Sequence, residues 1–215
     1  MTAHKSDIES AVSILLTPGG LDLNALDAGL GYAMGAGIDY ADLYFQRTWQ
    51  EGWVLEDGEV KEASYNIDGG VGVRSLAGEK TGFAYSNQIT ADALMDTGRT
   101  ASGIVRSGKQ LPGQKVMPVS AASYYAGIDP LAGLSAEDKV AMLKEADRVA
   151  RAADPSISQV SASLSGTYEV VLVRASDGTL AADIRPLVRF NVSVIAAKDG
   201  RRERVRRAPR ARRRR

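Results

Sequence analysis

The chain has 215 residues, enough for one sizeable domain or two small ones, and it contains no cysteine, which excludes disulfide and thiolate chemistry. Of its 27 basic and 26 acidic residues, residues 201–215 hold ten Arg and one Glu, a net of +9. Residues 1–200 therefore carry 17 basic and 25 acidic residues, a net of −8, and such an acidic body argues against a nucleic-acid surface. The apolar run Ala11–Leu16 is too short for a signal peptide or a membrane span, so we expect a cytoplasmic protein.

Two helices are predicted at the N-terminal end. The first begins at Ser6 or Asp7 and ends at Pro18-Gly19-Gly20. The second begins at about Asn24 and ends at Gly35 and Gly37. In both, apolar residues recur at helical spacing, which predicts one buried face on each helix.

The segment from Tyr40 to Asn87 has the composition of β-strands and is rich in Tyr, Phe, Trp and Val. Three turn signals divide it: Asp57-Gly58, Asp68-Gly69-Gly70 and Ala77-Gly78. They predict an antiparallel meander of about four strands of roughly eight residues each. The glycines of "GVGVRSL" stand where side chains should pack, which indicates a close backbone approach or a bulge.

Two more helices and an irregular segment follow. Thr90 is the predicted cap of a helix over Ala91–Val105, and Ser107–Leu134 is irregular, either a draped loop or an interaction surface. Ser135 caps the clearest helix of the chain, which ends before Pro155. Its predicted apolar stripe consists of Val140, Leu143, Ala146 and Val149 or Ala150.

Strand patterns return from Val160 onward, with turns at Ser176-Asp177-Gly178 and Lys198-Asp199-Gly200. The second turn should begin a hairpin, but an Arg tract follows it, so we expect Leu187–Ala197 to be an exposed, association-prone edge. The predicted fold class is α+β, a twisted antiparallel sheet with helices packed on one face.

Few residues have the chemistry of a catalytic or metal site. His4 is the sole histidine, so the chain alone cannot assemble a Ser-His-Asp or Cys-His arrangement or a structural zinc site. Trp49 and Trp53 are expected in a core or interface rather than in ligand stacking. Three carboxylate pairs have two interpretations: either they bind Mg²⁺ or Ca²⁺, or they form turns and solvated faces. The pairs are Asp39 with Asp42, Glu56 with Asp57, and Asp177 with Asp183. We predict no catalytic, cofactor-binding or metal-binding residue in this chain.

Four long collinear stretches resemble one known family: "YADLYFQ", "WVLEDGEVKEASYNIDGGVGVR", "GEKTGFAYSNQIT" and "VSASLSGTYEVVLVRASDGTLAADIRPLVRFNVSVIAAKDGRRER". They are similar to the N-terminal half of the TldD-type members of the TldD/PmbA (TldD/TldE) family of bacterial zinc metallopeptidases. The resemblance runs from about Ile38 to Arg204.

The resemblance implies a cytoplasmic heterodimer of TldD with its homologue TldE, which cleaves unfolded peptides such as microcin precursors and an antitoxin. An older family name is modulator of DNA gyrase. It also implies that substrate enters as an extended strand, and that zinc lies on an HExxxH helix. No HExxxH sequence is present here, so the resemblance covers the family's N-terminal part and places zinc only in the full-length protein.

The tail "VRRAPRARRRR" departs from the family, which has a Gly-rich run at this point. Glycine codons of a GC-rich gene encode Ala and Arg when read out of frame. We therefore predict a TldD-like domain over residues 1–204 and a disordered tail over 205–215 that is a frameshift or truncation product. The competing interpretation is a selected basic arm that binds polyanions with steep salt dependence.

Three functions remain open from the sequence. The chain is part of a peptidase subunit that provides dimer contacts and a wall of the substrate cleft, and is inactive alone. Alternatively it is a non-enzymatic module that binds a TldE/PmbA-like partner, or a nonspecific polyanion binder that acts through its tail. None of these functions involves a membrane.

Overall fold

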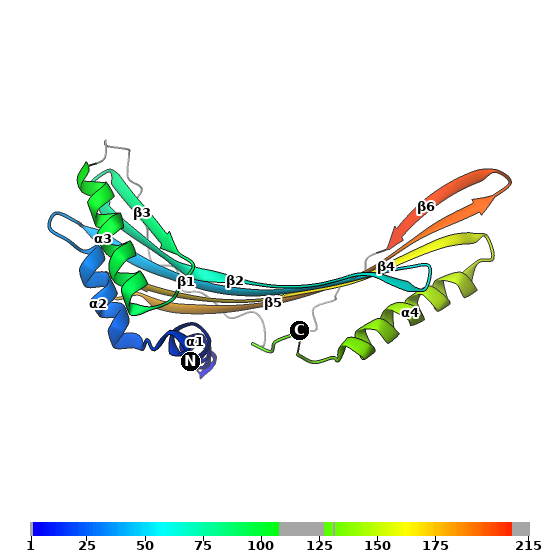
Figure 1. Cartoon of the computed structure of the whole chain (residues 1–215), viewed down its shortest axis with the longest axis horizontal. Helices are drawn as coiled ribbons and strands as arrows, with labels where there is room; N and C mark the ends of the chain where they lie inside the picture. The colour runs from blue at the N-terminus through cyan, green and yellow to red at the C-terminus, as the bar shows by residue number, and fades with distance from the viewer. Residues whose placement is uncertain (1, 108–126, 131, 208–215) are drawn as a thin grey trace. The chain divides into compact units, whose positions relative to one another are not determined.

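The computed structural model describes residues 2–107, 127–130 and 132–207, and among them the side chains of residues 7–106, 127–130 and 132–205. Most of the irregular segment predicted over Ser107–Leu134 lies outside these residues. The described strands form one six-stranded antiparallel sheet with helices, so the predicted α+β class is confirmed (Figure 1). None of the described helices is long and apolar enough to cross a membrane.

The strands lie in the spatial order β3-β2-β1-β4-β5-β6. Their bounds are β1 (Tyr40–Glu56), β2 (Glu59–Ala77), β3 (Lys80–Ser86), β4 (Ile157–Ala175), β5 (Leu180–Lys198) and β6 (Arg201–Arg207). Two bonds between β1 and β4 fix their direction: Ser176 N–H donates to Ala41 O, and Asp57 N–H donates to Val160 O, each at 2.9 Å. The residue number of the β4-side partner falls as the residue number along β1 rises, so this pair of strands is antiparallel.

The helical segments are α1 (Thr2–Ala11), a π-helical turn (Val12–Leu16), a 3₁₀ turn (Thr17–Gly19), α2 (Leu23–Ala33), α3 (Ala91–Ser107) and α4 (Ala136–Ala153). The first helix begins earlier than predicted, at Thr2 rather than at a Ser6 or Asp7 cap. The predicted stop holds, since Gly20 adopts the left-handed conformation that ends the 3₁₀ turn. Asp22 caps α2 by accepting from Ala25 N–H.

The contacts divide the chain into two compact units. Unit 1 comprises residues 1–48, 67–127 and 169–185, and unit 2 comprises 49–66, 128–168 and 186–215. Four of the strands, β1, β2, β4 and β5, contribute residues to both units. The single domain that the sequence predicts over residues 1–204 stays a prediction. The division into two units depends on strand pairing, which the sequence does not reveal.

In unit 1 the sheet has a covered face and an open face. In β1, Ala41, Leu43 and Phe45 are fully buried, whereas the alternate residue Tyr44 is exposed, as strand geometry requires. Helix α3 packs against α2 and β3 on the covered side (Figure 1). The largest fully buried side chains of this core are Leu15, Leu16, Leu26, Leu43, Phe45, Val71, Val73, Leu94, Val105 and Leu172.

Unit 2 has a smaller core beneath α4. Its buried members are Leu55, Leu143, Ala162 and Leu164, with Trp53, Ala146, Phe190 and Val192 packed around them. The predicted stripe of α4 is only partly correct. Leu143 is buried as expected, but Val149 is 51% exposed, and the buried side of the helix also holds Lys139 and Asp147.

The predicted turn at Asp68-Gly69-Gly70 is wrong, because these residues lie inside the 19-residue strand β2. The expected four strands between Tyr40 and Asn87 are therefore three. These glycines instead allow the backbone of β2 to lie close to neighbouring backbone atoms. A Cβ at Gly69 would lie 2.7 Å from the carbonyl oxygen of Gln46 and one at Gly70 only 2.2 Å from that of Ser86, so no larger residue fits without backbone movement.

The expectation of an exposed edge at Leu187–Ala197 is wrong where β6 pairs with β5. Residues 201–207 form this return strand, in a register that runs from Lys198↔Arg201 to Val192↔Arg207. Asp199 and Gly200 adopt positive φ angles of 51° and 76°, as a two-residue hairpin turn requires. Strand β6 continues through Arg204 to Arg207 and so includes Val205–Arg207 of the predicted tail, while residues 208–215 lie outside the described residues.

Removing β6 should therefore destabilise the protein and make it associate. A chain that ends at Gly200 exposes the hydrogen-bonding edge of β5, and we expect its Tm to fall by roughly 5 °C relative to a chain that ends at Arg207. Circular dichroism measures Tm, and light scattering measures mass against concentration. Equal Tm values and equal monomeric mass for the two chains would show that β6 contributes nothing.

Candidate functional site

Five of the six carboxylates singled out in the sequence take part in turns or ion pairs, and the sixth, Glu56, is exposed. Asp39 accepts from Gly78 N–H at 2.6 Å, and Asp177 accepts from Thr179 N–H at 2.9 Å. Asp42 forms an ion pair with Arg74, and Asp183 forms one with Arg185. In the part of the chain that the structure describes, no group of three or more His, Asp or Glu residues could hold a metal ion. The side chain of His4 lies outside that part, so the predicted lack of metal and catalytic residues stays a prediction.

Asp57 connects three elements of unit 2. Its Oδ1 accepts from the backbone N–H of Val160, at 3.0 Å, and from the guanidinium of Arg151 on α4. The Val160 N–H, followed by Arg151, holds the pKa of the Asp57 carboxyl below its ordinary value. Asp57 itself has a positive φ of 49° at the β1–β2 turn. It is thus a structural residue that links this turn to β4 and to the C-terminal end of α4.

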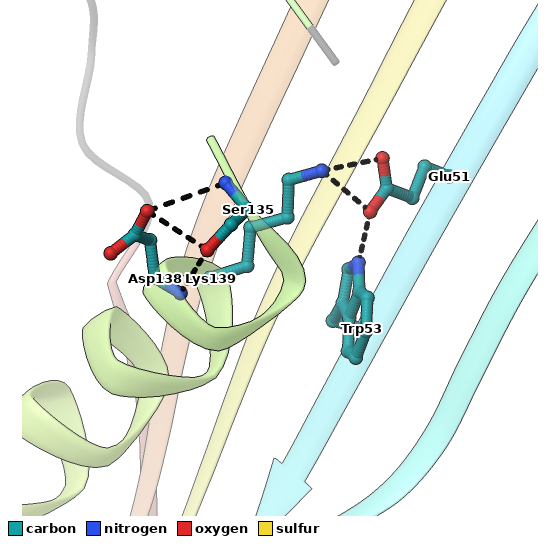
Figure 2. A network of polar contacts seen from close by, with 5 residues as sticks. All are labelled: Glu51, Trp53, Ser135, Asp138 and Lys139. Carbon is teal, nitrogen blue, oxygen red and sulfur yellow. Dashed lines mark hydrogen bonds and ion pairs between the residues drawn. The ribbon is translucent and has the colours of Figure 1, made fainter. Parts of the chain in front are cut away.

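A second polar link joins the start of α4 to β1 (Figure 2). The Lys139 ammonium bonds both carboxylate oxygens of Glu51, at 2.8 and 2.9 Å, and the indole N–H of Trp53 donates to the same carboxylate. The side chains of Lys139 and Glu51 are only 9% and 11% exposed. Two charges so nearly removed from water are acceptable only when paired and hydrogen-bonded, so each of them requires the other.

The cap of α4 lies beside this link. Ser135 Oγ accepts from Asp138 N–H at 3.1 Å, and the Asp138 carboxylate in turn accepts from the Ser135 N–H and hydroxyl (Figure 2). This capping box fixes the start of the helix at Ala136. It therefore also fixes the position of Lys139, one turn later, relative to Glu51.

Asp147 is the third polar residue on the buried side of α4. Its Oδ2 accepts from Arg151, at 3.1 Å, whereas its buried Oδ1 has no hydrogen-bond partner among the described residues. Arg151 therefore bridges Asp147 and Asp57. Neither Lys139 nor Asp147 could be assigned from sequence, because at helical spacing each could equally belong to a solvated face.

The open face of unit 1 carries a different polar network. Gln46 Nε2 donates to Glu169 at 2.7 Å, and Arg185 donates to the other oxygen of Glu169, also at 2.7 Å. Burial raises the pKa of Tyr44, and the Glu169 carboxylate adds to this effect. These side chains come from three adjacent strands, β1, β4 and β5, and only the strand register brings them together.

Next to this network lies a hollow of about 400 Å³. Its lining residues come from β1, β2, β3 and the segment after β3: Tyr44, Gln46, Thr48, Asp68, Gly69, Gly70, Val71, Gly72, Phe83, Tyr85, Ser86 and Asn87. The lining contains aromatic rings, amides, hydroxyls and one carboxylate. Such a set suits binding of a ligand rather than proton transfer or nucleophilic attack.

The two tryptophans lie in unit 2. Trp53 packs against the core cluster, and Trp49 lies 5.7 Å from Tyr168 between ring centroids. The core interpretation made from the sequence therefore holds for Trp53.

Two family models match this chain in order along its length. The model described as PmbA/TldA metallopeptidase domain 1 matches residues 41–105, and the PmbA/TldA metallopeptidase central domain matches residues 129–212. The second match extends beyond Arg204, where the resemblance noted in the sequence ends, and includes β6.

Among curated proteins, the chain is similar to two metalloprotease TldD homologs. It is 48% identical to that of Haemophilus influenzae over 192 residues, which are 88% of this chain and 40% of the relative. It is 42% identical to that of Buchnera aphidicola subsp. Acyrthosiphon pisum over 174 residues, which are 79% of this chain and 35% of the relative. The chain thus spans two fifths or less of the length of these relatives.

Among solved structures, the fold resembles that of a candidate modulator of DNA gyrase from Bacteroides thetaiotaomicron, with a TM-score of 0.70 and 15% identity. That match covers 85% of this chain and 43% of the other. TldE from Thermococcus kodakarensis gives a TM-score of 0.62 at 13% identity, covering 86% and 42%. At these identities the likeness concerns the fold.

The buried Lys139–Glu51 pair yields a stability prediction. Lys139→Met leaves the Glu51 carboxylate buried without its cation, and we expect a loss of about 3 kcal/mol in the free energy of unfolding. The double variant Lys139→Met, Glu51→Gln should recover most of this loss, because the introduced amide is uncharged and its oxygen can still accept from Trp53.

Lys144→Met, on the exposed side of α4, is the matched control and should change stability little. Urea unfolding followed by circular dichroism measures all three variants. A Lys139→Met protein as stable as the Lys144→Met protein would contradict the pairing described for Glu51.

Proposed function

Because this chain belongs to the PmbA/TldD metallopeptidase family, we propose that it is the domain 1 and central-domain portion of a TldD-like peptidase subunit. In this role it contacts a homologous subunit of the TldE/PmbA type and forms one wall of a cleft for unfolded peptides. It provides binding surface and scaffold rather than the hydrolytic step. We place it in the cytoplasm with the rest of such an enzyme.

The observation that carries this proposal is the ordered match to two consecutive family domains, together with 48% identity to a TldD homolog. The match covers only 40% of that relative, so the activity of the whole enzyme is attributed to the assembly and not to this chain. The structural likeness to TldE supports a homologous partner, since related folds commonly pair with one another.

A catalytic zinc ion does not fit the described residues. Zinc needs about three closely spaced His, Cys, Asp or Glu ligands, and those present are dispersed or already bound in turns and ion pairs. The described residues therefore give no basis for a zinc site, and no step of hydrolysis is assigned to them.

A partner-binding module without turnover is the alternative, and β2 favours it. Residues 59–68 of β2 are exposed on both faces. They include three large hydrophobic side chains, Val60, Tyr65 and Ile67, at 39%, 62% and 54% exposure. A strand exposed on both faces with apolar side chains is a natural contact surface for another chain. Polyanion binding through residues 205–215 has less support, because the first three of them lie in β6.

A competition experiment tests the main proposal. The full-length TldD homolog of H. influenzae is mixed with its TldE/PmbA-type subunit, and cleavage of an unfolded fluorogenic peptide is followed while this chain is added. We expect concentration-dependent inhibition, because the chain occupies the partner's docking surface without supplying a metal site. Size-exclusion chromatography with light scattering should detect the complex of this chain with the partner.

If this chain forms a complex with the partner but does not inhibit peptide cleavage, the alternative is favoured, namely a module that binds elsewhere on the partner. Neither complex nor inhibition would contradict both. Cleavage by this chain alone, abolished by a chelator and accompanied by stoichiometric zinc, would contradict the proposed division of labour. Heat-unfolded chain serves as the control for competition by an unfolded substrate.

A further inference from the structure

The hollow on the open face of unit 1 has a floor without side chains. Gly70 and Gly72 line it, between Tyr44, Gln46 and Thr48 of β1 and the side chains of β3. A Cβ at Gly72 would come within 3.0 Å of the Phe83 ring. Glycine at this position therefore lets the ring lie close over the strand, and a side chain here would occupy the space beside it.

Aromatic rings form the walls of this hollow. Phe83 and Tyr85 are neighbours on β3, with ring centroids 6.5 Å apart and planes at 24°. They are 56% and 78% exposed, and Tyr44 is 37% exposed, so all three are accessible to a ligand. The negative faces of such rings attract cations, and a planar guanidinium stacks on them as well.

The charge of this face is negative. Asp68 lines the hollow; one of its oxygens accepts from Gly69 N–H at 2.8 Å, and the other has no partner within the described parts of the chain. On the adjacent strands Glu169 and Asp183 share a single cation, Arg185. The negative charges of Asp68, Glu169 and Asp183 are therefore balanced by only one guanidinium, whereas the charges of Asp42 and Arg74 neutralise each other.

We propose that this hollow binds an arginine side chain of an extended peptide, with the guanidinium stacked on Tyr85 or Phe83 and paired with Asp68. The hollow of about 400 Å³ is large enough for one long side chain. The peptide context rests on the proposed function, since an unfolded substrate presents its side chains singly. The chemistry of the hollow, aromatic walls with an unpaired carboxylate oxygen, selects the cationic side chain.

The test uses the ¹⁵N-labelled full chain and the capped tripeptide acetyl-Gly-Arg-Gly-amide, titrated by NMR. Replacing Arg with citrulline, which has nearly the same shape but no charge, gives the matched probe. We expect the arginine peptide to shift the amide signals of Gly69, Gly70 and Gly72, and to bind about tenfold more tightly than the citrulline peptide.

Two variants locate the interaction. Asp68→Asn keeps an acceptor for Gly69 N–H but removes the charge. It should weaken binding of the arginine peptide about tenfold and leave binding of the citrulline peptide unchanged. Tyr85→Leu should weaken binding of both peptides. Glu79→Gln, an exposed residue of the same unit outside the hollow, removes the same charge and should have no effect. Unchanged circular dichroism confirms that the variants fold.

Equal affinity for the two peptides would overturn the proposal and assign the hollow to neutral side chains. Asp68→Asn binding arginine as tightly as the parent chain, or shifts confined to other residues, would also overturn it. The test needs neither partner nor cleavage, so its failure is distinguishable from a failure of the competition experiment, which concerns the assembly.

Discussion

Cross-strand pairing over unusually long strands is the constraint on which the rest of this structure depends. Four strands of 17 to 19 residues, β1, β2, β4 and β5, each contribute residues to both compact units. A shift of one residue in any of them would exchange buried and exposed side chains along its whole length. The register therefore sets the core of each unit and also the composition of the open face that carries the candidate binding residues.

Polar groups on buried or half-buried positions fix the remaining elements to this sheet. Helix α4 has few large apolar residues on its covered side, and ion pairs position it instead: Lys139 with Glu51 near its start and Arg151 with Asp57 near its end. Such pairs contribute modestly to net stability but disfavour any other placement of the helix, because displacement would leave a charge buried and unpaired. On the open face, by contrast, Asp68 is exposed and the Asp183 side chain is 40% exposed.

Local signals in the sequence predicted the elements that depend only on neighbouring residues. The caps at Thr90 and Ser135 and the strand pattern of the segment that forms β5 are of this kind. The prediction of a turn at Asp68-Gly69-Gly70 is wrong because glycine is common both in turns and where two strands approach closely. Only the position of Gln46 on the neighbouring strand distinguishes these two cases. The Lys139–Glu51 pair spans 88 residues, and Glu169 meets Gln46 across 123, so no sequence pattern could predict either contact. Strand β6 was missed because ten arginines dominated the interpretation of a correctly identified hairpin turn.

The continuity of β2 through Asp68-Gly69-Gly70 is tested most directly by inter-strand NOEs at Gly69 and Gly70. A continuous β2 predicts contacts between the α-protons of Gly69 and Arg47 and between Gly70 and Asn87, since these backbones approach closely. A reverse turn at Asp68-Gly69-Gly70 predicts contacts between Ile67 and Val71 instead. Observation of the first set would confirm the long strand on which both the fold and the arginine hollow rest. Observation of only the second would contradict both.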